Sequence, residues 1–64
     1  MKTAPKKRDQ KGTKAKLLKA ALDIFSKEGY DAATTRSIAK KAGVNESLIH
    51  RYFGSKSGLF VALI

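Results

Sequence analysis

The chain has 64 residues, no cysteine, and 14 Lys and Arg against 5 Asp and Glu, a formal charge of +9. This length allows one small domain with a marginal core, and the lack of cysteine excludes disulfides and thiolate metal sites as extra stabilisers. The longest apolar run, residues 59–64, is too short for a secretory signal or a membrane span, so we expect a soluble intracellular protein without a membrane partner.

The positive charge is concentrated near the N-terminus. Residues 1–19 carry eight basic side chains and one acidic one, whereas residues 20–64 carry six basic and four acidic. Residues 1–12 contain the only proline and show no apolar periodicity, so we expect a flexible basic arm there. Such an arm fits a polyanion such as nucleic acid, and equally fits a solvated tail.

The first helix is expected at residues 13–28. Thr13 can cap its N-terminus, and Gly29 suits the left-handed residue that ends a helix. Apolar residues at helical spacing predict a stripe that faces the core. That stripe consists of Leu18, Ala21, Leu22 and Phe25, widened by Leu17 and Ile24.

Three more helix starts follow, each marked by a capping residue. Thr34 is expected to begin a helix to about residue 41, Asn45 one to about residue 53, and Ser55 a fourth that reaches residue 64. Gly43 and Gly54 fit the turns between them. The core-facing residues of these helices are expected to be Ile38, Ala39, Ala42, Val44, Ile49 and Phe53.

This order of elements predicts an all-α fold. Residues 13–64 should form a three-helix, homeodomain-like bundle with a helix-turn-helix at about 34–53, followed by the start of a fourth helix. The outer side of the third helix would then carry Glu46, Ser47, His50 and Arg51. Polar side chains on an exposed helix, flanked by positive charge, suit the major groove of DNA.

At this point the sequence resembles the TetR-type transcriptional regulators, whose DNA-binding region it matches over residues 13–64 without a gap. The matching residues are Phe25, Gly29, Tyr30, Thr34, Ile38, Ala39, Ala42, Gly43, Val44, Ile49, Tyr52, Phe53, Lys56 and Leu59. The resemblance implies that the start of the second helix contacts the DNA backbone and that the third helix reads bases.

The resemblance also indicates which residues bind DNA. His50 stands where the family usually has a tyrosine that contacts the operator backbone, and Lys56 matches a lysine that holds phosphate. The expected DNA-binding residues are Thr35, Arg36, Asn45, Glu46, Ser47, Leu48, His50, Arg51, Tyr52 and Lys56.

Some of these residues have a second interpretation. Glu46 can complement the dipole at the start of the third helix, or accept a hydrogen bond from a cytosine amino group. Leu48 can pad the edge of the core or touch a thymine methyl group. Thr34 is interpreted as a cap rather than a DNA ligand.

The expected function is therefore sequence-specific binding of double-stranded DNA by the module of a transcriptional regulator, with repression favoured over activation. The resemblance implies a palindromic operator, a homodimer formed through a C-terminal domain absent from these residues, and a place in the bacterial cytoplasm at the nucleoid. The alternative is a helical protein-interaction module that docks through the apolar residues 59–64 of the fourth helix. One histidine, five scattered acids and no phosphate-binding loop argue against an enzyme, a metal site or a cofactor.

Overall fold

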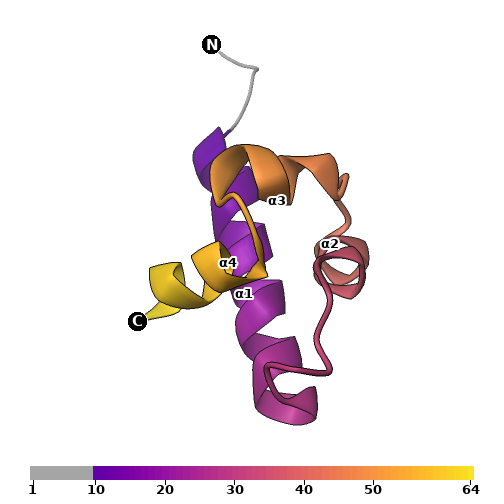
Figure 1. Ribbon diagram of the computed structural model, residues 1–64. Helices are drawn as coiled ribbons and strands as arrows, with labels where there is room; N and C mark the ends of the chain where they lie inside the picture. The colour runs from indigo at the N-terminus through magenta and orange to yellow at the C-terminus, as the bar shows by residue number, and fades with distance from the viewer. Residues whose placement is uncertain (1–9) are drawn as a thin grey trace, which may run out of the picture.

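The computed structural model describes residues 10–64, which form four helices and no strand. The helices are α1 (Gln10–Glu28), α2 (Thr35–Ala42), α3 (Ser47–Tyr52) and α4 (Lys56–Leu63). The long helix α1 packs against both α2 and α4, and in Figure 1 these two lie on opposite sides of it. The all-α fold with a helix-turn-helix and a fourth helix is confirmed. None of the four helices is both long and apolar enough to cross a bilayer.

The start of α1 differs from the predicted one. The helix begins at Gln10, three residues before Thr13, so Thr13 lies within the helix and does not cap it. Gln and Lys are good helix formers, and they outweigh the cost of the single glycine at residue 12. The remainder of the predicted basic arm, residues 1–9, lies outside the described residues. The C-terminal end is as predicted, because Gly29 follows Glu28 with a φ of 87°.

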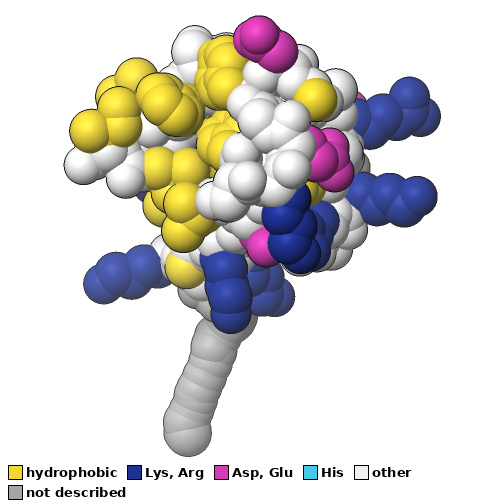
Figure 2. Space-filling model, turned by 90° about the horizontal axis from the view of Figure 1, so that it is seen from below, with side chains coloured by type: hydrophobic (Ala, Val, Ile, Leu, Met, Phe, Trp, Pro, Cys, Tyr) yellow, Lys and Arg dark blue, Asp and Glu magenta, His cyan; other side chains and the backbone are white. Residues whose placement is uncertain are grey.

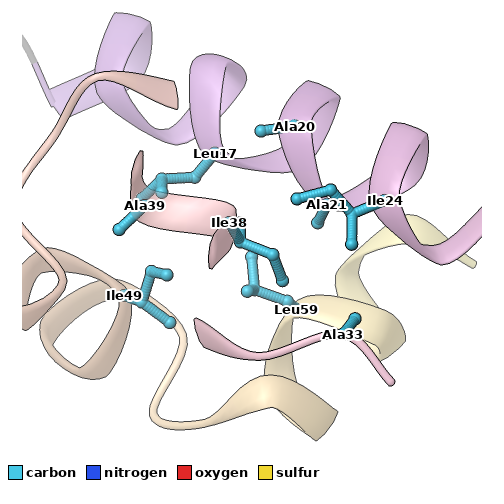
Figure 3. Packing of buried hydrophobic residues seen from close by; sticks show 9 residues of the cluster. All are labelled: Leu17, Ala20, Ala21, Ile24, Ala33, Ile38, Ala39, Ile49 and Leu59. Carbon is cyan, nitrogen blue, oxygen red and sulfur yellow. The ribbon is translucent and has the colours of Figure 1, made fainter. Parts of the chain in front are cut away.

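The core is a single cluster in which all four helices take part. Side chains of α1 point toward those of the three shorter helices in Figure 3. The buried members are Leu17, Ala20, Ala21, Ile24, Ala33, Ile38, Ala39, Ile49 and Leu59. The structure confirms that three of the predicted core residues are buried: Ile38, Ala39 and Ile49. The other three are half-buried and pack at the edge of the core: Ala42, Val44 and Phe53.

The predicted stripe on α1 was wrong at one position. Leu22 is 55% exposed, although it shares the helical spacing of Leu18 and Phe25, which are half-buried. Apolar residues occupy so much of the circumference of α1 that their spacing alone does not predict which side of the helix is buried. The other helices pack on the side of Leu17, Ala21 and Ile24, whereas Leu22 lies outside the buried cluster.

Helix α2 begins with a reciprocal cap. Thr34 Oγ1 accepts a hydrogen bond from the backbone N–H of Ser37 over 3.0 Å, and Ser37 Oγ accepts one from the N–H of Thr34 over 3.3 Å. Two amide groups that would otherwise lack a partner at the helix start are thereby satisfied. The predicted cap at Thr34 is confirmed.

Thr34→Ala should lower the stability of the domain by about 1 kcal/mol, because the amide of Ser37 loses its acceptor. In a domain of this size that corresponds to a fall in melting temperature of roughly 4–8 °C, measured by circular dichroism. Thr34→Ser keeps an oxygen at the same place and should melt close to the wild type. Equal melting of the alanine variant and the wild type would contradict a capping role.

Helix α3 is shorter than predicted at both ends, and α4 ends one residue earlier than predicted. Asn45 Oδ1 accepts from the N–H of Ser47 over 2.9 Å, but the N-cap of α3 is Glu46, one residue after the predicted Asn45. Regular helix begins only at Ser47 and ends at Tyr52. Ser55 caps α4 as predicted, since its Oγ accepts from the N–H of Gly58. A Cβ atom at Gly58 would overlap the carbonyl oxygen of Phe53, so glycine lets the first turn of α4 lie directly on the end of α3.

An ion pair joins α1 to the end of α2. Asp23 lies 2.9 Å from Lys41 Nζ and 3.4 Å from Lys27 Nζ, one turn further along α1. The hydrogen bond from Lys41 lowers the pKa of the Asp23 carboxyl below its ordinary value of 3.8, Lys27 lowers it further, and partial desolvation opposes both.

The ion pair at Asp23 should make stability depend on pH in acid. Because the pKa of Asp23 is lower in the folded chain, its contribution is complete above pH 3.8 and is lost as the pH falls through the folded pKa. Asp23→Asn should therefore melt below the wild type at neutral pH and approach it in strong acid. A difference between the two proteins that stays constant down to strong acid would contradict this assignment.

Candidate nucleic-acid interface

The N-terminal ends of three helices are held together by side-chain hydrogen bonds. Thr35, the first residue of α2, donates from Oγ1 to Oε2 of Glu46, just before α3, over 2.7 Å. Lys56, the first residue of α4, donates from Nζ to the carbonyl oxygens of Tyr30 over 2.8 Å and Ala33 over 3.0 Å. Since Ala33 directly precedes the cap of α2, these bonds fix the starts of α3 and α4 beside the start of α2.

Helix α3 presents a polar outer surface. Ser47, His50 and Arg51 are exposed, as is Asn45 just before the helix. His50 is oriented by its own turn, because its Nδ1 lies 3.2 Å from the carbonyl oxygen of Gly54. The outer side of the third helix therefore carries the polar side chains that the sequence predicts there.

Two of the predicted site residues belong partly to the core. Leu48 and Tyr52 are half-buried and pack against the buried cluster. The ammonium of Lys14 on α1 lies 5.4 Å from the centre of the Tyr52 ring, a cation–π contact that ties α1 to α3. Only the remaining edge of each side chain can contact a partner.

Lys56 acts as a clamp between α4 and the loop before α2. Besides its two carbonyl acceptors, its ammonium lies 4.3 Å from the centre of the Tyr30 ring. The Tyr30 ring in turn packs against Phe25 and Phe60, with ring centres 5.4 and 5.3 Å away. An ammonium has three N–H donors, and the two carbonyl oxygens use two of them.

Lys56→Met should destabilise the domain by about 1–3 kcal/mol, because two charge-assisted hydrogen bonds and a cation–π contact are lost. Thermal unfolding followed by circular dichroism measures the loss. Lys40→Met, at an exposed lysine of α2, is the matched control and should leave the melting temperature nearly unchanged. If Lys56 served only to contact DNA, both variants would melt like the wild type.

The surface charge near these helices is mostly positive. Residues 10–64 carry ten basic and four acidic side chains. In Figure 2 apolar side chains gather on one side of the visible face, and most Lys and Arg side chains lie on the other side and along the lower edge. Within the described residues, no three His, Cys, Asp or Glu side chains come together as ligands for a metal.

Comparison with known protein families identifies the fold. The family model described as bacterial regulatory proteins, tetR family, matches residues 17–63. That match includes all of α2, α3 and α4, and α1 from Leu17 to its end. The chain belongs to the tetR family.

Individual TetR-family relatives carry regulator names. The chain is 46% identical over 52 residues to the HTH-type transcriptional regulator YvkB of Bacillus subtilis, 81% of this chain and 28% of the relative. It is 40% identical over 52 residues to the HTH-type transcriptional repressor NicS of Pseudomonas putida, 81% of this chain and 24% of the relative. It is 37% identical over 57 residues to the repressor SCO4008 of Streptomyces coelicolor, 89% of this chain and 30% of the relative. The chain thus spans about a quarter to three tenths of these relatives.

The TetR-type pattern locates the helix starts but does not reveal the bonds between them. Thr35 and Glu46 are 11 residues apart, and Lys56 is 23 and 26 residues from its acceptors. Lys14, which covers the Tyr52 ring, lies before the region where the sequence suggested a site. No spacing rule along one helix could have indicated these contacts, because they depend on how separate helices cross.

Proposed function

We propose that this TetR-family domain binds double-stranded DNA as the reading module of a transcriptional regulator. Helix α3 would lie in the major groove with Ser47, His50 and Arg51 toward the bases and backbone. Arg36, exposed in the first turn of α2, would hold phosphate, with the remaining N–H of Lys56 as a second contact.

The observation that carries this proposal is the linked set of helix starts. Thr35–Glu46 and Lys56–Ala33 hold the starts of α2, α3 and α4 together, with a polar, exposed side of α3 beside them. The positive ends of the eight-residue helices α2 and α4 add to the attraction for phosphate. A rigid polar helix flanked by positive charge is the arrangement that helix-turn-helix proteins place in the major groove.

The whole protein would act as a dimeric repressor in the bacterial cytoplasm, at the nucleoid. Two of the relatives are named repressors, which supports repression. A homodimer formed through a further C-terminal domain would place two copies of α3 on a palindromic operator, with half-sites about one helical turn or more apart.

The alternative of a protein-interaction module that docks through α4 is not favoured. Relatives that match most of this chain are named transcriptional regulators or repressors. These names also indicate a family of regulators rather than of enzymes.

Operator selection from random duplexes tests the proposal, followed by affinity measurements at several salt concentrations. A preferred sequence should emerge, and its affinity should fall by about 100-fold between roughly 50 and 200 mM salt if about four phosphates are contacted. Affinity that is independent of salt, or a selection that enriches no sequence, would contradict it.

A matched pair of variants assigns the phosphate contact. Arg36→Ala should weaken binding to every sequence alike and reduce the salt slope by about one. Lys40→Ala removes another exposed charge from the same helix, four residues further on, and should change the affinity much less.

A further inference from the structure

A groove runs along α1 and the C-terminal end of α2, apart from the proposed DNA-binding surface. Its volume is about 820 Å³, and it is open to solvent. The lining residues are Lys16, Lys19, Ala20, Leu22, Asp23, Ser26, Lys27, Lys41 and Ala42. None of them is among the residues predicted to bind DNA, so the groove is a second surface of the domain.

The groove is strongly basic. Four lysines and one aspartate line it, a net charge of +3. Asp23 is already engaged by Lys27 and Lys41, so it does not neutralise the other two lysines. Lys16 and Lys19 are exposed and form no ion pair within residues 10–64. The groove therefore offers at least two ammonium groups to an acidic partner.

The same groove also presents apolar surface. Leu22 is 55% exposed among these lysines, and Ala20 and Ala42 contribute further apolar atoms to the lining. A phosphate backbone would satisfy the lysines but would leave Leu22 in contact with water. A partner that matches both features carries carboxylates next to an apolar side chain.

We propose that this groove binds an acidic amphipathic peptide segment of another protein. One apolar side chain of the segment packs on Leu22, and its carboxylates pair with Lys16 and Lys19. These 64 residues contain no such segment, because their five acidic residues are never adjacent. Because the groove lies outside the proposed DNA-binding surface, both partners can bind at once.

A short synthetic peptide tests the proposal. The stretch of α1 from Lys16 to Lys27 is about 17 Å long, which an extended peptide of about six residues spans. The probe is the capped peptide Glu-Leu-Glu-Glu-Leu-Glu, added to the isotope-labelled 64-residue chain at physiological salt. Its control has serine in place of both leucines. The leucine peptide should shift the amide signals of residues 16–27 and 41–42, and the serine peptide should bind several-fold more weakly.

Single variants at exposed positions then assign the contacts. Leu22→Ser and Lys19→Glu should each weaken binding of the leucine peptide by roughly fivefold. Val61→Ser, at a residue that is 67% exposed on α4, and Lys11→Glu, at an exposed lysine outside the groove, are the matched controls and should bind like the wild type. Circular dichroism confirms that each variant is folded.

Several results would overturn the proposal. Equal binding of the leucine and serine peptides would show general charge attraction rather than a fitted groove. Shifts confined to residues 34–37 and 45–56, or to α4, would place the peptide elsewhere. If duplex DNA shifted the groove amides, the groove would be a phosphate-binding surface. If the leucine peptide did not bind at millimolar concentration, the groove would not be a site for acidic amphipathic peptides.

Discussion

Replacing Ile38 with alanine should leave most of the domain unfolded at physiological temperature. Ile38 lies in the middle of α2 with its side chain completely buried, among residues of α1 and α4. Removing a buried side chain of this size costs about 2–5 kcal/mol, from lost burial and from the cavity left behind. A single core in a domain this small rarely supplies more than about 3–5 kcal/mol in total.

Urea and thermal unfolding, followed by circular dichroism, measure the effect of Ile38→Ala. Leu22→Ala is the matched control, since it deletes a side chain of similar size from a position that is 55% exposed. It should change the stability by less than about 1 kcal/mol. If both variants unfolded at the same urea concentration, α2 could not be packed on α1 as the structure shows.

The fold was largely predictable because its boundaries depend on local chemistry. The caps at Thr34 and Ser55 bond to amides three residues further on, and Gly29, Gly43 and Gly54 each adopt the positive φ that ends a helix. Such signals involve neighbouring residues, so the sequence contains all the information that they require.

The buried side of α1 and the connections within the site were less predictable. Apolar residues occupy so many positions of α1 that only the packing of α2 and α4 shows Leu22 to be exposed. The bond between Thr35 and Glu46, and the clamp made by Lys56, depend on how separate helices cross. The sequence could nominate these residues for DNA contact, but it could not indicate that they also bond to other parts of the domain.

Glu46→Ala should make DNA binding less selective while it strengthens binding to random duplexes. Glu46 lies just before α3, and its Oε2 accepts a hydrogen bond from Thr35 at the start of α2. This bond leaves Oε1 for a donor such as a cytosine amino group. Losing one such base contact would reduce discrimination at one operator position by about 5- to 150-fold, from about 1–3 kcal/mol. Removing a negative charge that lies near phosphates raises the affinity for every sequence.

Operator variants at each position and one random duplex, measured at the same salt concentration, reveal both changes. Glu46→Gln serves as the control, because its amide oxygen can still accept a hydrogen bond while the charge is gone. It should increase random binding as the alanine variant does, but retain more of the discrimination. If Glu46→Ala discriminated between operator variants as well as the wild type at every position, Glu46 would have only a structural role.

Variants of Thr35 test whether the Glu46 carboxylate must be held in position by Thr35 in order to read a base. The Thr35 hydroxyl has a single proton, and that proton is donated to Glu46, so Thr35 cannot also donate to a phosphate while the bond exists. Thr35→Val keeps the shape of the side chain but releases Glu46, whereas Thr35→Ser retains the hydroxyl. We therefore expect Thr35→Val to lose discrimination at the same base pair as Glu46→Ala, and to have little effect when Glu46 is already alanine. If Thr35 instead contacted the backbone directly, Thr35→Val would weaken binding to all sequences alike and would do so regardless of the residue at position 46.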